Sequence, residues 1–96
     1  MEKAITPAVK RIMDIASNEI EKAMSCEFAT LEEVGKSYNE LCHNMSERLN
    51  KMKEAKGLFT SDEWEDTREY VKIKLSAMYS DAMQRTRQRL RNEYEF

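Results

Sequence analysis

Residues 56–64 read KGLFTSDEW, and they lie between two long segments rich in helix-forming residues. Gly57 is one of two glycines in the chain and follows a run of lysines. A glycine with positive φ ends many helices, and lysines before it complement the negative end of the helix dipole. Thr60 and Glu63 have the spacing of a capping box, in which each side chain accepts a hydrogen bond from the other residue's backbone N–H. The stretch therefore predicts a tight turn between a helix that ends near residue 56 and one that begins at residue 61.

The single tryptophan of the chain also belongs to this predicted turn. Phe59 stands directly before the capping threonine, and Trp64 follows Glu63. These two positions pack together in a hydrophobic staple, which fixes the angle at which the chain enters the helix. We therefore interpret Trp64 as a residue that sets the helix–helix turn and not as a binding residue.

Two earlier positions carry the same kind of helix-start signal. Thr6 precedes Pro7, and proline suits the first helical position because its missing N–H would have no partner there. Thr30 and Glu33 form another capping box. Apolar residues then recur at three- and four-residue steps, which in the middle segment alternate as they do along a coiled-coil seam. The predicted helices span about residues 7–27, 31–56 and 61–94.

Length and composition predict an all-α fold in a single domain, residues 1–96. Two glycines and one proline are too few turn residues for a protein built from β-strands. At 1.5 Å per residue the helices would be about 30, 40 and 50 Å long, so the third would overhang the second by roughly 10 Å. The chain is then either a three-helix bundle or a long antiparallel hairpin with a shorter N-terminal helix. We expect a three-helix unit that oligomerises through its remaining apolar surface, most readily as a dimer.

Charge and cysteine content indicate a cytoplasmic protein that does not enter a membrane. Sixteen basic and eighteen acidic residues give a formal net charge of −2, and both signs are mixed along the chain. Charged residues interrupt the first thirty positions, where a secretory signal would need an apolar core. No apolar run approaches the length of a membrane span. Cys26 and Cys42 lack a CxxC spacing, and we interpret them as reduced thiols.

Candidate catalytic and metal-binding residues are few. Cys42 and His43 are adjacent, but neighbouring helical residues point about 100° apart, so the pair does not form a nucleophile and base. Glu40 and His43 have the spacing of one half of a di-metal motif, and the chain has no second histidine to repeat it. We therefore expect no enzyme activity, no metal and no cofactor.

The overhanging end of the third helix is the most promising interaction surface. Apolar and aromatic residues continue there after the second helix has ended, and methionines on such a surface adapt to a partner. The main hypothesis is a small non-enzymatic interaction module, acting as a regulator, inhibitor or adaptor, of the kind that phages and mobile elements often encode. The residues predicted to contact a partner protein are Tyr79, Met83, Arg87, Leu90, Arg91 and Tyr94.

The arginines near the C-terminus support an alternative function in nucleic-acid binding. Arginine-rich helices can follow a phosphate backbone with salt-dependent affinity. The alternating spacing, however, divides the four arginines into two pairs about 200° apart around the helix, Arg85 with Arg89 and Arg87 with Arg91. A groove-binding face would repeat every three or four residues, and arginines near a helix C-terminus are favoured by the helix dipole. We therefore favour a solvated helix end over a nucleic-acid site, and nucleic-acid binding stays the second hypothesis.

Overall fold

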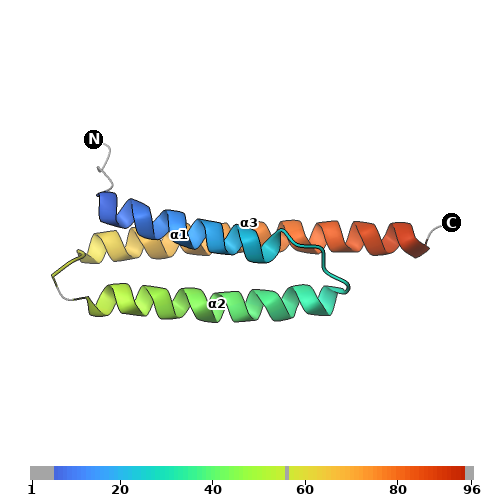
Figure 1. Cartoon of the computed structure of the whole chain (residues 1–96), viewed down its shortest axis with the longest axis horizontal. Helices are drawn as coiled ribbons and strands as arrows, with labels where there is room; N and C mark the ends of the chain where they lie inside the picture. Colours follow the sequence, from blue (N-terminus) through green and yellow to red (C-terminus); the bar gives the residue numbers. More distant parts are fainter. Residues whose placement is uncertain (1–5, 56, 95–96) are drawn as a thin grey trace.

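Three helices make up the fold in the computed structural model, which describes residues 6–55 and 57–94. They are α1 (Pro7–Met24), α2 (Leu31–Glu54) and α3 (Ser61–Tyr94), packed side by side (Figure 1). The prediction of an all-α three-helix bundle is confirmed. Within the described residues, the membrane-span criteria of length and apolar character are met by none of these helices.

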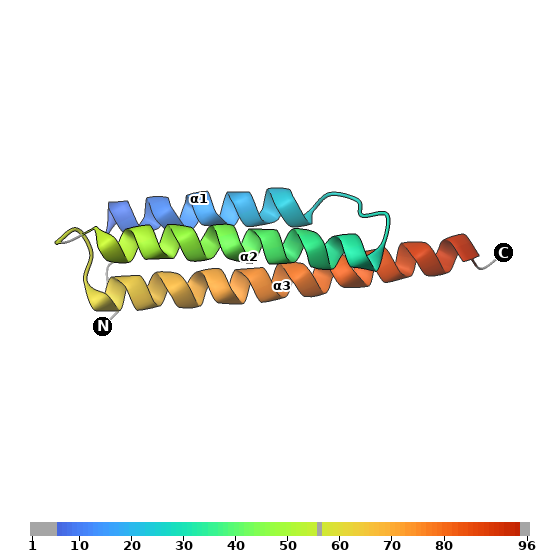
Figure 2. The ribbon, with the colours of Figure 1, turned by 90° about the horizontal axis from the view of Figure 1, so that it is seen from below.

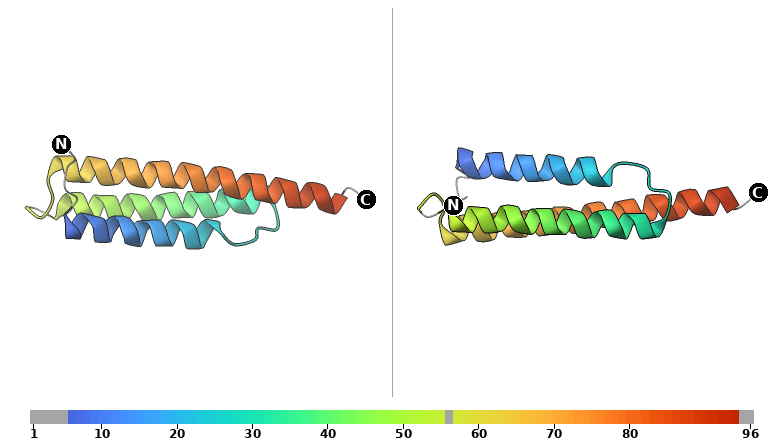
Figure 3. Two further views of the ribbon diagram at one scale, coloured as in Figure 1. Left: turned by 90° about the horizontal axis from the view of Figure 1, so that it is seen from above. Right: turned by 60° about the horizontal axis from the view of Figure 1, so that its bottom comes forward.

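Contacts at the two ends of the bundle define its topology. At one end the hydroxyl of Thr6 donates to Glu63 (3.1 Å), and towards the other end Lys74 Nζ donates to Glu21 Oε1 (2.6 Å). Helices α1 and α3 therefore run in the same direction, with α2 antiparallel to both (Figure 2). All three helices are in contact, and α3 continues past the loop that joins α1 to α2 (Figure 3).

The turn between α2 and α3 has the predicted capping box. Glu63 N donates to Thr60 Oγ1 (3.1 Å), and Thr60 N donates to Glu63 Oε1 (2.9 Å). Gly57 has the predicted positive φ, 78°. The helix nevertheless ends at Glu54 with Ala55 as its cap, slightly before the predicted end at residue 56, which lies outside the described residues.

Trp64 belongs to this turn and also joins two helices. Its indole Nε1 donates to the backbone carbonyl of Leu49 on α2 (2.9 Å). The ammonium group of Lys53 lies 4.8 Å from the centre of the indole ring, a cation–π contact. Phe59 and Trp64 line the same small hollow at this end of the bundle. The interpretation of Trp64 as a turn residue agrees with these contacts, while its hydrogen bond to α2 could not be read from the sequence.

Helix α1 ends at Met24, three residues before the predicted end at residue 27. Ser25 caps it by donating its N–H to the carbonyl of Glu21 (2.9 Å). The chain then leaves the helix and turns. This turn places Phe28 in the core, where 5% of its surface is exposed. Of the predicted capping box, the hydrogen bond from Glu33 N to Thr30 Oγ1 is present. The Glu33 carboxylate, however, accepts from the N–H of Ala29 (3.1 Å) in place of that of Thr30.

The core contains two threonines that the apolar pattern of the sequence did not predict. Thr67 and Thr86 are 0% and 3% exposed. Their hydroxyls donate to the carbonyls four residues earlier, of Glu63 (2.8 Å) and Ala82 (2.7 Å), so both polar groups are satisfied inside the helix. The apolar core cluster around them consists of Ala16, Ile20, Met24, Phe28, Val34, Leu41, Met45, Val71, Leu75 and Ala82.

Glu63 is expected to make stability depend on pH in the acid range. The backbone N–H of Thr60, helped by the hydroxyls of Thr6 and Thr60, lowers the pKa of Glu63 below its ordinary value of 4.5, against the opposing effect of burial. A lowered folded-state pKa means stabilisation that is fully present above pH 4.5 and lost as the pH falls through the folded-state value. Urea unfolding at a series of pH values should show Glu63→Gln less stable than the wild type at neutral pH, with the difference vanishing in acid. Glu65→Gln, which changes an exposed carboxylate nearby, is the control; an equal pH dependence in both variants would contradict the prediction.

Candidate functional site

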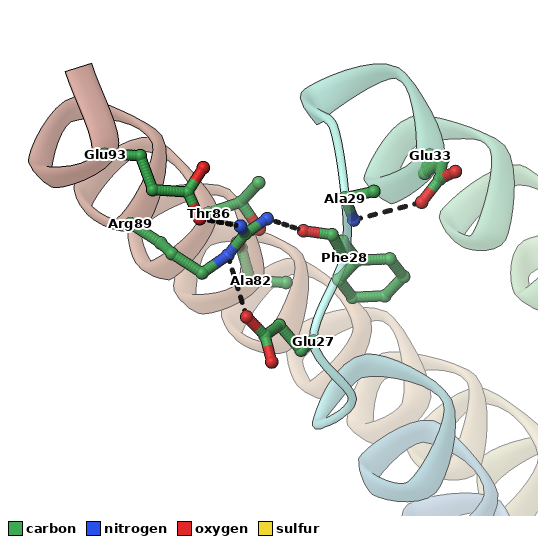
Figure 4. Close-up of polar contacts among 8 residues, drawn as sticks. All are labelled: Glu27, Phe28, Ala29, Glu33, Ala82, Thr86, Arg89 and Glu93. Carbon is green, nitrogen blue, oxygen red and sulfur yellow. Dashed lines mark hydrogen bonds and ion pairs between the residues drawn. The ribbon is translucent and has the colours of Figure 1, made fainter.

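Arg85 and Arg89 of α3 hold the end of α1 and the loop that follows it. Figure 4 shows the contacts of Arg89 with this loop. Arg85 donates from Nη2 to the last carbonyl of α1, that of Met24 (2.5 Å), and from Nε to Asp81 (2.8 Å). Arg89 donates from Nη2 to the carbonyl of Phe28. Arg85 thus supplies a hydrogen bond to a carbonyl that the end of α1 leaves without a helical partner, and Arg89 supplies one to a carbonyl of the loop.

Two carboxylates also surround the guanidinium group of Arg89. Glu93 lies 2.8 Å from Nη1, and Glu27 lies 3.2 Å from Nε. The Arg89 side chain is only 27% exposed, so its contacts are partly shielded from solvent. Its bonding groups are therefore directed at this chain's own loop and carboxylates.

The predicted nucleic-acid face is divided by these contacts. Arg87 and Arg91 are exposed, whereas Arg85 and Arg89 are used in the loop contacts. A nucleic-acid function that used Arg85 and Arg89 would require these side chains to release the carbonyls of Met24 and Phe28. A polar hollow of about 690 Å³ lies beside this second pair, and its lining residues all belong to α3.

The residues predicted to contact a partner lie in two different settings. Tyr79 and Met83 are half-buried and pack against the core, and the ring of Tyr79 lies 4.2 Å from that of Tyr38 on α2. Leu90 is half-buried, whereas Arg87 and Arg91 are exposed. Tyr94 is the last residue of α3, and its side chain lies outside the described part of the structure.

A groove between α2 and α3 is a second candidate interaction surface, and sequence reasoning did not find it. It has a volume of about 300 Å³, and none of its lining residues comes from α1. It therefore lies on the face of the α2–α3 pair that α1 does not cover. The lining residues are Tyr38, Cys42, Met45, Ser46, Leu49, Arg68, Val71, Lys72, Leu75 and Ser76.

This groove, which we call the α2–α3 groove, combines an apolar floor with polar edges. Buried Met45, Val71 and Leu75 contribute to its floor, while Arg68 and Lys72 are exposed. Tyr38 is held between the two helices by its contact with Tyr79. The hydrogen bond with Cys42 is the larger cause, and burial the smaller one, that raise the pKa of the Tyr38 hydroxyl above its ordinary value.

The α2–α3 groove and the overhang lie on the same side of α3. Lys72, Ser76, Tyr79, Met83 and Leu90 follow one another at steps of three, four or seven residues, which keeps them on one stripe of a helix. The groove lining ends at Ser76, and the predicted contact residues begin at Tyr79. One surface along α3 therefore includes both. The prediction that Tyr79 lies beyond the end of α2 was wrong, because its ring packs against Tyr38 of α2, so the overhang begins further along α3.

The candidate catalytic and metal-binding residues lie apart from this surface or lack the other groups that such sites need. His43 faces outwards and lies 3.4 Å from Glu47. In residues 6–55 and 57–94, no three histidine, cysteine or carboxylate side chains are grouped closely enough to hold a metal ion. Both cysteines are free thiols; Cys26 is exposed near the end of α1, and Cys42 lines the α2–α3 groove.

Comparison with known proteins gives no relative from which a function could be inferred. No family model matches the chain, and no curated protein or solved structure matches it either.

Proposed function

We propose that this protein is a non-enzymatic interaction module that binds a helix of another protein and so acts as a regulator, inhibitor or adaptor. The observation that carries the proposal is the α2–α3 groove, which has an apolar floor and is lined by no residue of α1. Two parallel ridges with an apolar floor accept a third helix, whose residues at steps of three and four insert between them. The reduced state of both thiols is consistent with a cytoplasmic location.

The side chains of this surface are suited to a bound helix. Met83 and Leu90 are half-buried on the stripe that extends the groove, and methionine adapts its shape to a partner. Contact with both would extend the interface from the groove onto the overhang. Homodimer formation stays a prediction, which the mass of the purified chain in light scattering would test.

Site-specific photocrosslinking tests the proposed function. The photoreactive residue p-benzoylphenylalanine is placed at Ser76, an exposed residue at the edge of the groove, and in a second variant at Asn18, an exposed residue of α1. Irradiation in the source cell should link the first variant to a distinct protein, and mass spectrometry should place the crosslink in a helical segment of that protein. The second variant should not yield the same product.

Two outcomes would contradict this function. Equal crosslinking from Ser76 and Asn18 would mean that the groove is no preferred surface. Crosslinks from Ser76 to nucleic acid would instead support the alternative that the arginines suggested. Circular dichroism of both variants verifies that each has retained the helical fold.

A further inference from the structure

We propose that the helix bound in the α2–α3 groove is amphipathic and carries acidic residues along the edges of its apolar face. This inference rests on the proposed function and adds the chemistry of the partner. Two observations support this inference: the charges at the edge of the groove, and the small side chains along its walls.

Both charged residues that line the α2–α3 groove are cationic. They are Arg68 and Lys72, one turn apart on α3, and no carboxylate is among the lining residues. Within the described part of the chain, neither makes an ion pair. Glu65 and Glu69 precede them by three positions on α3, but neither lines the groove. Arg68 also lies over the indole ring of Trp64, 5.8 Å from its centre, a cation–π contact that leaves its charge without a carboxylate. A carboxylate of a bound helix could therefore approach both cations without displacing an internal carboxylate.

The groove is as long as a short helix, and its small side chains allow a partner helix to pack closely. From Tyr38 to Leu49 the α2 wall extends about 16 Å at 1.5 Å per residue, which is three helical turns. Cys42, Ser46 and Ser76 are small residues within this length. Small side chains allow a partner helix to approach to the 8–10 Å interaxial distance of packed helices.

Other occupants fit the same surface less well. A second copy bound by two-fold symmetry through this groove would bring the Arg68–Lys72 pair near its own equivalent, and like charges repel. Nucleic acid would satisfy the cations but leave the apolar floor without a matching apolar surface. An acidic amphipathic helix complements both the charge and the floor.

Two synthetic peptides test the charge preference. Each is a fluorescently labelled amphipathic helix of three to four turns, with leucine at the core positions and either glutamate or lysine beside them. Anisotropy titration of the wild-type chain at low salt should give an affinity for the glutamate peptide about tenfold or more above that for the lysine peptide. The preference should weaken as the ionic strength rises, since salt screens exposed charges.

Charge reversal in the groove should reverse the preference. Lys72 has no hydrogen-bond or ion-pair partner among the described residues, so Lys72→Glu should fold normally, which circular dichroism verifies. Lys72→Glu should bind the lysine peptide more tightly than the wild type does and the glutamate peptide less tightly. Arg11→Glu, which makes the same charge change on an exposed residue of α1, should leave the wild-type preference in place.

The two cysteines provide a footprint of the bound peptide. Cys42 lines the groove and Cys26 does not, so the glutamate peptide should slow alkylation of Cys42 several-fold and leave Cys26 unchanged. Equal affinities of the two peptides, or tight binding without protection of Cys42, would overturn this inference. Protection of Cys42 by a DNA duplex but not by the peptide would overturn it as well. A helical protein crosslinked from Ser76 would in each of these cases leave the proposed function standing.

Discussion

Replacing Ile20 with alanine is expected to lower the free energy of unfolding by about 2–5 kcal/mol. Ile20 is 0% exposed and lies in the core cluster between α1 and the other two helices. Alanine leaves a cavity that the neighbouring side chains fill only in part, so packing contacts are lost as well as apolar burial. For a chain of this length the whole folding free energy is roughly 5–15 kcal/mol, so the change removes a large share of it.

Urea unfolding followed by circular dichroism measures this effect, and the chain offers a matched control. Ile15 lies on the same helix but is 43% exposed, so Ile15→Ala should cost much less. Trp64 lies in the first turn of α3 and contacts α2. Its fluorescence should report the same transition if the bundle unfolds as one unit. Equal losses for the two substitutions would show that α1 does not pack against the core through the face described.

Replacing Arg89 with alanine is expected to lower the free energy of unfolding by about 1–3 kcal/mol. The substitution removes the charge-assisted hydrogen bond to the carbonyl of Phe28 and both ion pairs, to Glu27 and Glu93. The carbonyl contact should dominate, because ion pairs to exposed carboxylates contribute little. The loss should also loosen the loop that places Phe28 in the core.

Arg87→Ala is the control for this prediction, because it removes an exposed arginine two positions away on the same helix. Unfolding experiments should show a small effect for the control, within about 0.5 kcal/mol. Amide hydrogen exchange should become faster at Ala29 in the Arg89 variant and remain unchanged in the control. If both variants lost the same stability, the loop would not depend on Arg89.

The apolar stripes and capping signals predicted most of the fold because they depend on residues close in sequence. The capping box of Thr60 and Glu63 formed as expected, and α3 has its predicted bounds. The predicted end of α1 was three residues too late, and the carbonyl at its actual end is bonded by a residue about sixty positions away. Arg85 reaches the carbonyl of Met24 only after α3 has packed against α1, so no local pattern encodes that stop.

The candidate site was predictable in part for a similar reason. The stripe through Tyr79, Met83 and Leu90 was visible as a helical repeat, and the length of α3 indicated an overhang. The α2–α3 groove was not visible, because Cys42 and Ser46 form its wall with residues of another helix. The sequence also predicted that the four arginines point in two directions from the helix. It did not predict which pair would bond the end of α1 and the loop after it.

By itself the sequence determined three helices, the turn at Gly57 and the place of Trp64 in that turn, since helix propensity, capping and apolar periodicity act over a few residues. Only the tertiary structure decided which helix faces are packed inside the bundle and which remain accessible to a partner. Packing of α1 against α2 and α3 places Arg85 and Arg89 on the loop, buries Thr67 and Thr86, and leaves the α2–α3 groove uncovered. Such surfaces depend on how helices meet, and that geometry arises when side chains far apart in the chain pack together.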